Sequence, residues 1–381
     1  MPEAQPDRIQ PDQAATQPQA VTSLIQGHSP YHAMRHGAAY LGDSLDLMTS
    51  LPDSSVQLVL TSPPFALTRQ KAYGNKSSDE YIEWFLPFAR QFKRILNDTG
   101  SFVVDLGGAY LPGHPVRSLY QYELLVRLCR EEGFFLAQEF YHYNPSRLPA
   151  PAEWVNVRRI RVKDSINVVW WLSKTEYPKA DNRRVLQPYS ESMTQLLKNG
   201  YKAMLRPSGH DISGKFQRDN HGAIPPHIVQ DGPDEEVTHL LELANTESNS
   251  LYLRRCKAEG TKPHPARFPQ GFAQFFINFL TDPSDLVLDP FAGSNTTGYV
   301  AETLSRRWLA FEISEAYLAG SKYRFEGMEK IGDVAGAETV RTKSPSRKKA
   351  RRASGDHSVL PIATSADGHS ASDVVEVGLW D

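Results

Sequence analysis

The chain has 381 residues, of which 40% are hydrophobic and 10% aromatic, and its 42 basic and 44 acidic side chains give a net charge of −2. This is a globular composition, long enough to bury a sizeable core, and its charge excludes a uniformly basic protein that coats nucleic acid. Two cysteines, Cys129 and Cys256, are too few for a disulfide scaffold or a structural zinc site. The chain shows no secretory segment and no run of about 18 apolar residues, so we expect a cytoplasmic protein without membrane contact or metal.

The two ends of the chain differ from its body. Residues 1–27 are rich in proline and glutamine, lack hydrophobic periodicity and are expected to be a disordered tail. Residues 332–381 lose periodicity again and are expected to form a second disordered tail. Within it, residues 341–352 carry seven Lys or Arg and no acid. This run is either a non-specific DNA tether or a charged tail without function.

The first structured block is expected to span residues 28–177. A short apolar strand at 56–60 ends in a Ser-Pro-Pro turn, and residues 79–96 have apolar side chains at helical spacing. The pattern then predicts, in order, a strand at 101–106, a helix at 119–130, and strands at 134–141 and 165–172.

The second block is expected to span residues 263–331. The pattern predicts a helix at 272–280, a strand at 286–288, a helix from about Thr296, a strand at 308–313 and a last helix. Strands that alternate with helices predict an α/β fold with a doubly wound, mostly parallel sheet. Residues 178–262 lie between the blocks, are polar and poorly periodic, and are interpreted as an inserted module rather than sheet framework.

A turn rich in small residues follows the strand at 286–288 and reads Asp-Pro-Phe-Ala-Gly-Ser-Asn-Thr-Thr-Gly at 289–298. In doubly wound sheets, ligands bind at the carboxyl ends of strands near the free amides of helix N-termini. Glu312 ends the next strand, where a carboxylate can accept both hydroxyls of a ribose. The turn has neither GxGxxG spacing nor the lysine of a P-loop, so it favours a nucleoside with little or no phosphate, such as S-adenosylmethionine. The alternative is an ordinary helix cap with a solvent-facing Glu312.

The turn Thr-Ser-Pro-Pro-Phe at 61–65 is the second candidate site. Two prolines remove two backbone donors, so the turn presents carbonyl oxygens and the Ser62 hydroxyl as rigid acceptors. Such acceptors suit the exocyclic amine of a nucleobase, whose lone pair they would free for attack on a methyl group, and Phe65 would stack on a base that has left the duplex. A structural Pro-Pro turn with a core phenylalanine is the alternative for this segment alone.

With both turns in this order, the chain resembles the beta group of amino-group DNA methyltransferases. The similarity runs from about Tyr40 to Phe325 and is closest to cytosine-N4 enzymes, with both tails outside it. It includes stretches beyond the generic motifs, at 100–110, 206–212 and 264–269. The family places its target-recognition region between the two blocks, which would assign that role to residues 178–262. The resemblance implies cytosine-N4 methylation, because Ser-Pro-Pro is commoner in that branch and Asp-Pro-Pro in the adenine branch.

The resemblance also implies roles for individual residues. The methyl-transferring turn would consist of Ser62, Pro63, Pro64 and Phe65. S-adenosylmethionine would be held by Asp289, Phe291, Gly293, Ser294, Asn295, Thr296 and Glu312, with His264, Arg267 and Phe268 as the other wall and Asp43 in reach. Asn295 stands where the family often has glycine, and asparagine tolerates a left-handed backbone. Asp105, at a strand end, is expected to orient Ser62 or contact the cofactor, or else to form an ordinary Asx turn. Neither cysteine follows a proline, so a cytosine-C5 mechanism is set aside.

DNA contacts are expected in two places. The densest basic stretch of the body is interleaved with Trp154 and comprises Arg147, Arg158, Arg159, Arg161 and Lys163. These side chains would hold phosphates, unless the stretch is a solvated strand edge. Base-edge or phosphate donors of the insert would be Arg206, Ser208, His210, Lys215, Arg218 and Asn220. The acidic run at 231–236 leaves target identity open, although a palindromic CAGCTG-type site is the guess that the resemblance allows.

We therefore expect a site-specific duplex-DNA methyltransferase that uses S-adenosylmethionine and base flipping, and that works beside a restriction endonuclease. It is expected to be a monomer or weak dimer without an obligate protein partner. The alternatives are an adenine-N6 methyltransferase and a catalytically silent, S-adenosylmethionine-sensing DNA-binding regulator, with an RNA substrate as a third.

Overall fold

In the computed structural model of the protein, the structure is described for residues 21–66, 76–145, 147–200, 218–231, 241–243, 251–267 and 269–328. The expected tail at 332–381, with its basic run, lies outside the described residues. The expected N-terminal boundary at residue 27 needs correction. Residues 21–23 form a 3-10 helix (η1, Val21–Ser23), and Val21, Leu24 and Ile25 are buried in the core.

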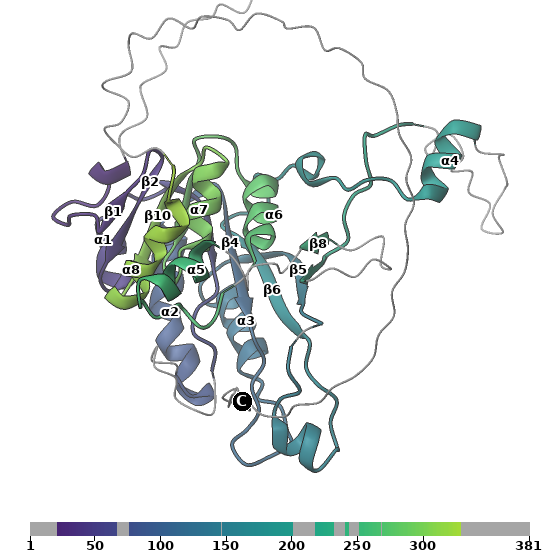
Figure 1. Ribbon diagram of the computed structural model, residues 1–381, viewed down its shortest axis with the longest axis horizontal. Helices are drawn as coiled ribbons and strands as arrows, with labels where there is room; N and C mark the ends of the chain where they lie inside the picture. The colour runs from purple at the N-terminus through teal and green to yellow at the C-terminus, as the bar shows by residue number, and fades with distance from the viewer. Residues whose placement is uncertain are drawn as a thin grey trace, which may run out of the picture.

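One mixed sheet organises the described chain. Its strand order is β1-β2-β10-β9-β3-β4-β6-β5-β7-β8, and the labelled strands can be followed from β1 at the left of Figure 1 to β8 at the right. The strands are β1 (His32–Ala33), β2 (Gly37–Leu41), β3 (Val56–Thr61), β4 (Leu96–Leu106), β5 (Phe135–Tyr143), β6 (Ile166–Ser173), β7 (Ile228–Asp231), β8 (Leu241–Leu243), β9 (Leu286–Asp289) and β10 (Arg307–Glu312). The five strands from β2 to β4 are mutually parallel, and β6 is the antiparallel strand between β4 and β5.

Helices cover both faces of this sheet, which confirms the doubly wound α/β class. One core cluster contains the buried faces of α1 (Ser44–Thr49), α2 (Ser78–Ile95) and α3 (Tyr120–Arg130). The other contains those of α6 (Gln270–Leu280), α7 (Thr296–Thr303) and α8 (Glu315–Ser321). Aromatic side chains at spacings of three and four residues give α2 its buried stripe, with Tyr81, Phe85, Phe88 and Phe92 all on the core side.

The carboxyl ends of the parallel strands meet at one edge of the sheet. The turns after β2, β3, β4, β9 and β10 therefore all open at this edge. Strand β5 runs antiparallel to β6, as β4 does, so the carboxyl end of β5 and the start of β6 lie at the same edge. The two segments singled out in the sequence, 61–65 and 289–298, are neighbours here because β3 pairs directly with β9.

Two regions differ from the sequence-based expectation. The β1–β2 hairpin and α1 were not predicted, because the segment Gly-Ala-Ala-Tyr-Leu of β2 has low strand propensity. The segment 178–262 was expected to contribute no sheet framework, yet β7 pairs with β5 and β8 pairs with β7. The rest of the described insert contains a 3-10 helix (η3, Asn182–Val185), α4 (Glu191–Asn199) and α5 (Leu251–Ala258).

Helix α5 packs against the second block rather than apart from it. It contacts α8 and the 3-10 helix η6 (Lys322–Phe325), and its Tyr252 and Cys256 are buried. None of the helices in the described part of the chain is long and apolar enough to cross a membrane.

We expect Gly37 to be required by close packing of β2 on β10. A Cβ atom at this position would lie 2.3 Å from the indole of Trp308. Gly37→Ala should therefore lower the free energy of unfolding by about 1–3 kcal/mol, as overpacked cores do. Urea unfolding followed by circular dichroism measures this loss. In a Trp308→Leu background the same change should cost much less, and an equal cost in both backgrounds would contradict the packing argument.

Candidate functional site

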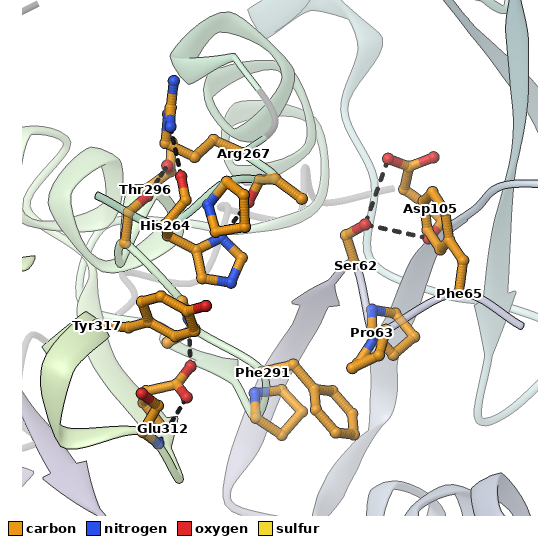
Figure 2. A pocket seen from close by; sticks show the side chains of 18 of the residues that line it. Ser62, Pro63, Phe65, Asp105, His264, Arg267, Phe291, Thr296, Glu312 and Tyr317 are labelled. Carbon is orange, nitrogen blue, oxygen red and sulfur yellow. Dashed lines mark hydrogen bonds between the residues drawn. The ribbon is translucent and has the colours of Figure 1, made fainter. Parts of the chain in front are cut away.

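A pocket of about 660 Å³ opens at the carboxyl edge of the sheet. Its walls come from the turns after β2, β3, β5, β9 and β10, from single residues of β4, β5 and β6, and from residues 264–267 and helices α2 and α8. Figure 2 shows Ser62, Pro63, Phe65 and Asp105 on one side of this pocket. His264, Arg267, Thr296, Glu312 and Tyr317 lie on the other side, with Phe291 between the two groups. The structure thus brings both predicted turns into one cavity.

Asp289 lies beneath the pocket rather than on its surface. It is 2% exposed, and its carboxylate accepts hydrogen bonds from Thr61 Oγ1 (2.8 Å), Thr297 Oγ1 (2.7 Å) and the Phe291 amide (3.1 Å). Burial raises the pKa of Asp289 to about 6, against these hydrogen bonds. The expectation that Asp289 holds the cofactor directly is therefore replaced by a role in fixing the turn.

Two left-handed residues shape the turn after β9. Gly293 has φ of +52°, and a Cβ atom there would lie 3.1 Å from the His264 ring. Asn295 also has a left-handed φ of +57°, and its side chain caps α7 by accepting from the Gly298 amide (3.0 Å). Asn295 thus adopts the left-handed backbone conformation that the sequence led us to expect. It is fully buried, however, and does not line the pocket.

Glu312, the last residue of β10, lines the pocket. It is 9% exposed, and its two carboxylate oxygens accept from the amides of Gly293 and Ser314, each at 2.8 Å. Burial raises the pKa of Glu312 above its ordinary range. Glu312 therefore lines the pocket and also holds the turn after β9 against the end of β10, through its hydrogen bond from the Gly293 amide. The alternative interpretation of Glu312 as a solvent-facing residue is therefore excluded.

Residues 264–267 also line the pocket, and Figure 2 places His264 and Arg267 on the same side as Glu312. The His264 ring lies edge-on against Tyr317, with ring centroids 4.4 Å apart, and the His264 amide donates to Tyr252 Oη (2.9 Å). Burial, with a smaller effect of the nearby Arg267 and Arg324 guanidinium groups, lowers the pKa of His264 to about 4. The imidazole is therefore neutral at physiological pH. Phe268, predicted beside it, lies outside the described residues.

Further residues of the site were not predicted, among them Arg324, which holds a pocket residue without lining the pocket itself. Arg324 is 5% exposed and donates to the carbonyl (2.8 Å) and hydroxyl (2.9 Å) of Ser294. Trp84 and Phe88 from α2 contact Phe291, with centroid separations of 5.8 and 4.9 Å. Ile313 also lines the pocket although it is 70% exposed, which leaves an apolar surface free beside Glu312. The helical spacing of Trp84 and Phe88 was the only signal for these residues in the sequence.

The turn after β3, for which the sequence predicts catalysis, lines the side of the pocket that faces away from Glu312. Ser62 Oγ lies 3.3 Å from the Asp105 carbonyl and 3.5 Å from Asp105 Oδ2, so the expected partnership of Ser62 and Asp105 is geometrically available. Asp105 is 2% exposed, and its Oδ1 has no hydrogen-bond partner. Phe65 lies over Gly107, where a Cβ atom would come within 2.5 Å of its ring. Asp43 also lines the pocket and caps α1 by accepting from the Leu45 amide (2.8 Å). Neither Cys129 nor Cys256 lines this pocket.

The loop between β5 and β6 carries the predicted basic stretch and starts at the same sheet edge. Only Arg147 of this stretch lines the pocket. Arg158 pairs with Glu153 (2.8 Å) and lies over the Trp154 ring, within a short π-helix (η2, Glu153–Val157). Arg161 and Lys163 donate to the carbonyls of Pro115 and Pro145, and Arg159 is exposed. The insert residues Arg206, Ser208, His210 and Lys215 lie outside the described residues, whereas Arg218 and Asn220 are exposed.

Comparison with known proteins gives a consistent match. A family model described as DNA methylase matches residues 56–322. The chain is 51% identical over 315 residues to the type II methyltransferase M.PvuII of Proteus hauseri, covering 81% of this chain and 90% of the relative. It is 25% identical to the type II methyltransferase M.ScaI of Streptomyces caespitosus, covering 76% of this chain and 81% of the relative.

A solved structure agrees with these sequence matches. It is that of the PvuII DNA methyltransferase, described as cytosine-N4-specific. It superposes with a TM-score of 0.62 at 46% sequence identity and covers 78% of this chain and 89% of that chain.

The buried carboxylate of Asp289 predicts a pH dependence of stability. The folded protein holds its proton more tightly than the unfolded chain, so ionising Asp289 costs stability as pH rises from about 4 to about 6. The shift corresponds to about 3 kcal/mol at most. Asp289→Asn removes this titration and should become more stable relative to the wild type across that pH interval. Urea unfolding of both proteins at several pH values measures the difference, and parallel stability curves would contradict the prediction.

Proposed function

Because the chain belongs to the DNA methylase family and is a type II DNA methyltransferase, we propose that it methylates the N4 amine of cytosine in a short duplex site. One observation supports this most directly. The Thr-Ser-Pro-Pro-Phe turn and the turn after β9 line a single pocket, with the catalytic acceptors on one side and Glu312 on the other. The sequence identity to M.PvuII supports the choice of cytosine N4.

The residues of the pocket fit S-adenosylmethionine. Glu312 would hold the ribose hydroxyls, and Phe291 and Ile313 would cover the faces of the adenine ring. Asp43, Glu312 and Asp105 place carboxylates around the cavity, which suits a cationic ligand and disfavours a phosphate-rich one. The neutral His264 adds no positive charge beside a sulfonium. When bound, this cofactor supplies an electrophilic methyl group.

The turn at 61–65 prepares the base amine. Pro63 and Pro64 lack backbone donors, so the turn offers the Ser62 hydroxyl and main-chain carbonyls as acceptors for the two N–H groups. These hydrogen bonds favour a tetrahedral nitrogen and free its lone pair for the methyl carbon. After transfer the amine sheds one proton, which the carboxylate of Asp105 would take, since its Oδ2 lies 3.5 Å from Ser62 Oγ. Phe65 stacks on the base outside the duplex.

The remaining parts of the proposal concern DNA and partners. Arg158, Arg159, Arg161 and Lys163 hold phosphates beside the pocket, and residues 178–262 read the target. The enzyme acts as a monomer or weak dimer in the bacterial cytoplasm, and it protects host DNA from a restriction endonuclease to which it does not bind obligatorily. The 51% identity to M.PvuII keeps a CAGCTG-type site as the first candidate target.

The modified base provides the main test of this function. Incubation of duplex plasmid with tritiated S-adenosylmethionine and the protein should label the DNA, and nuclease digestion should release N4-methylcytosine. Single-molecule sequencing of the same plasmid should place the modification in one short sequence. Release of N6-methyladenine would establish the adenine alternative instead, and sequence-specific retention in a gel without any label would indicate a silent DNA-binding regulator.

Two substitutions should separate catalysis from cofactor binding. Ser62→Ala removes an acceptor for the amine and should lower kcat by about 100- to 1000-fold, as the loss of one transition-state hydrogen bond does in other enzymes. Its affinity for S-adenosylmethionine should stay near the wild-type value.

Glu312→Ala is the matched control, since it should weaken S-adenosylmethionine binding at the far side of the same pocket. Isothermal titration calorimetry and single-turnover transfer measure the two effects. Normal turnover of Ser62→Ala would remove Ser62 from the mechanism.

A further inference from the structure

A row of buried polar side chains continues the pocket beyond Ser62. Asp105 on β4 pairs with Val169 on β6, and Asn167 on β6 pairs with His142 on β5. Side chains of paired residues share a face of a sheet, and so do those two positions apart on one strand, so Asp105, Asn167 and His142 all face the same way. They are 2, 5 and 7% exposed and all line the pocket. We call them, with Arg147, the polar row.

The polar row has an acceptor end and a donor end. His142 Nδ1 lies 3.4 Å from Asp105 Oδ2, which keeps the Asp105 carboxylate next to Ser62. At the other end, Arg147 Nη2 donates to Asn167 Oδ1 at 2.6 Å. Burying such groups is costly unless they are paired, and a guanidinium has five donors in a rigid fork. In the polar row, Asp105 Oδ1 has no hydrogen-bond partner. A ligand with both donors and acceptors along one edge would pair with this oxygen and with the guanidinium at the other end.

The order of donors and acceptors along this row matches one nucleobase. The edge of cytosine presents the N4 amine, then the acceptors N3 and O2. Adenine presents its N6 amine and the acceptor N1, but then a carbon-bound hydrogen. Thymine and guanine place a carbonyl oxygen where the amine must be, facing Asp105. In this pocket, hydrogen-bond acceptors at Ser62 and Asp105 are followed by the two donors of the Arg147 guanidinium. Cytosine pairs with all of them, whereas adenine leaves one guanidinium donor without an acceptor.

We propose that Arg147, held by Asn167, reads N3 and O2 of the flipped cytosine and makes the pocket select cytosine over adenine. This inference rests on the proposed N4-cytosine activity and assigns Arg147 to the base rather than to a phosphate. The remaining basic residues of the loop differ from Arg147 in their surroundings. Arg158 forms an ion pair with Glu153 at the surface, and Arg159 is exposed. Arg147, in contrast, lines the pocket and donates a hydrogen bond to the buried Asn167.

The test uses duplexes that carry the mapped site with a changed target base. In one, 3-deazacytosine keeps the amine and O2 but lacks the N3 acceptor; in another, adenine replaces the target cytosine. The wild type should lose about 10- to 100-fold in kcat/KM on 3-deazacytosine, the effect of leaving one buried donor unpaired. Arg147→Gln should have a lower kcat/KM on cytosine than the wild type. Its kcat/KM should fall much less between cytosine and 3-deazacytosine, and the ratio of its kcat/KM on cytosine to that on adenine should be smaller. Replacing N3 also changes the reactivity of the N4 amine itself. This change is the same for the wild type and Arg147→Gln, so it cancels when the two proteins are compared on both bases.

Arg159→Gln is the matched control in the same loop. It should lower transfer to cytosine, 3-deazacytosine and adenine by one common factor that changes with salt, as a phosphate contact does. An unchanged affinity for S-adenosylmethionine verifies that each variant is folded. If Arg147→Gln shows the same common factor, Arg147 is a phosphate contact and the inference is overturned. If the wild type instead forms N6-methyladenine, it is the proposed function that fails, which the wild-type product alone reveals.

Discussion

A single buried carboxylate joins the two halves of the site. Asp289 ends β9 and accepts from Thr61, the last residue of β3 and the neighbour of Ser62. It also accepts from Thr297 in the first turn of α7, so the cofactor turn and the catalytic turn share one anchor. A carboxylate with three donors around it can tolerate such burial, although its raised pKa shows that the hydrogen bonds do not fully offset the cost. The relative position of methyl donor and base amine depends on this anchor.

The pocket is divided into regions of different polarity. On the cofactor side, Glu312 and the neutral His264 adjoin an aromatic and aliphatic wall that includes Phe291 and Ile313. On the side proposed to hold the base, a buried carboxylate, imidazole and amide come from β4, β5 and β6, and the half-buried Arg147 guanidinium follows in the loop after β5. A sulfonium and a neutral heterocycle need different surroundings, and the sheet provides them from separate strands that meet at one edge. The modest net charge of the chain is compatible with DNA binding, because one basic stretch lies in the β5–β6 loop that starts at this edge.

The sequence was informative where function depends on a short continuous segment. The Pro-Pro turn, the small-residue turn after β9 and Glu312 all carry local signals, and the structure places them together as expected, which follows from the parallel sheet. Residues whose role depends on strand pairing could not be found this way. His142 and Asn167 look like ordinary polar residues of a half-buried strand, and only the register of β4, β6 and β5 aligns them with Asp105. Likewise Asp289 was read as a ligand contact, because its hydrogen bond to Thr61 spans 228 positions. The β1–β2 hairpin was missed because the Gly-Ala-rich start of β2 gives little strand signal on its own.

The pairing of β3 with β9 also has a consequence for biosynthesis. Strand β3 is made early, yet one of its two neighbours in the sheet consists of residues 286–289. At typical rates of about 5–20 residues per second, β3 waits on the order of ten seconds or more with one edge unpaired. Such long-range pairing folds slowly and exposes strand edges in the meantime. Neither the turn after β3 nor the turn after β9 can reach its final position before β9 has left the ribosome. Modification activity must therefore lag behind translation of most of the chain, so a newly acquired gene of this kind gives its host no protection until β9 and the turn after it have left the ribosome.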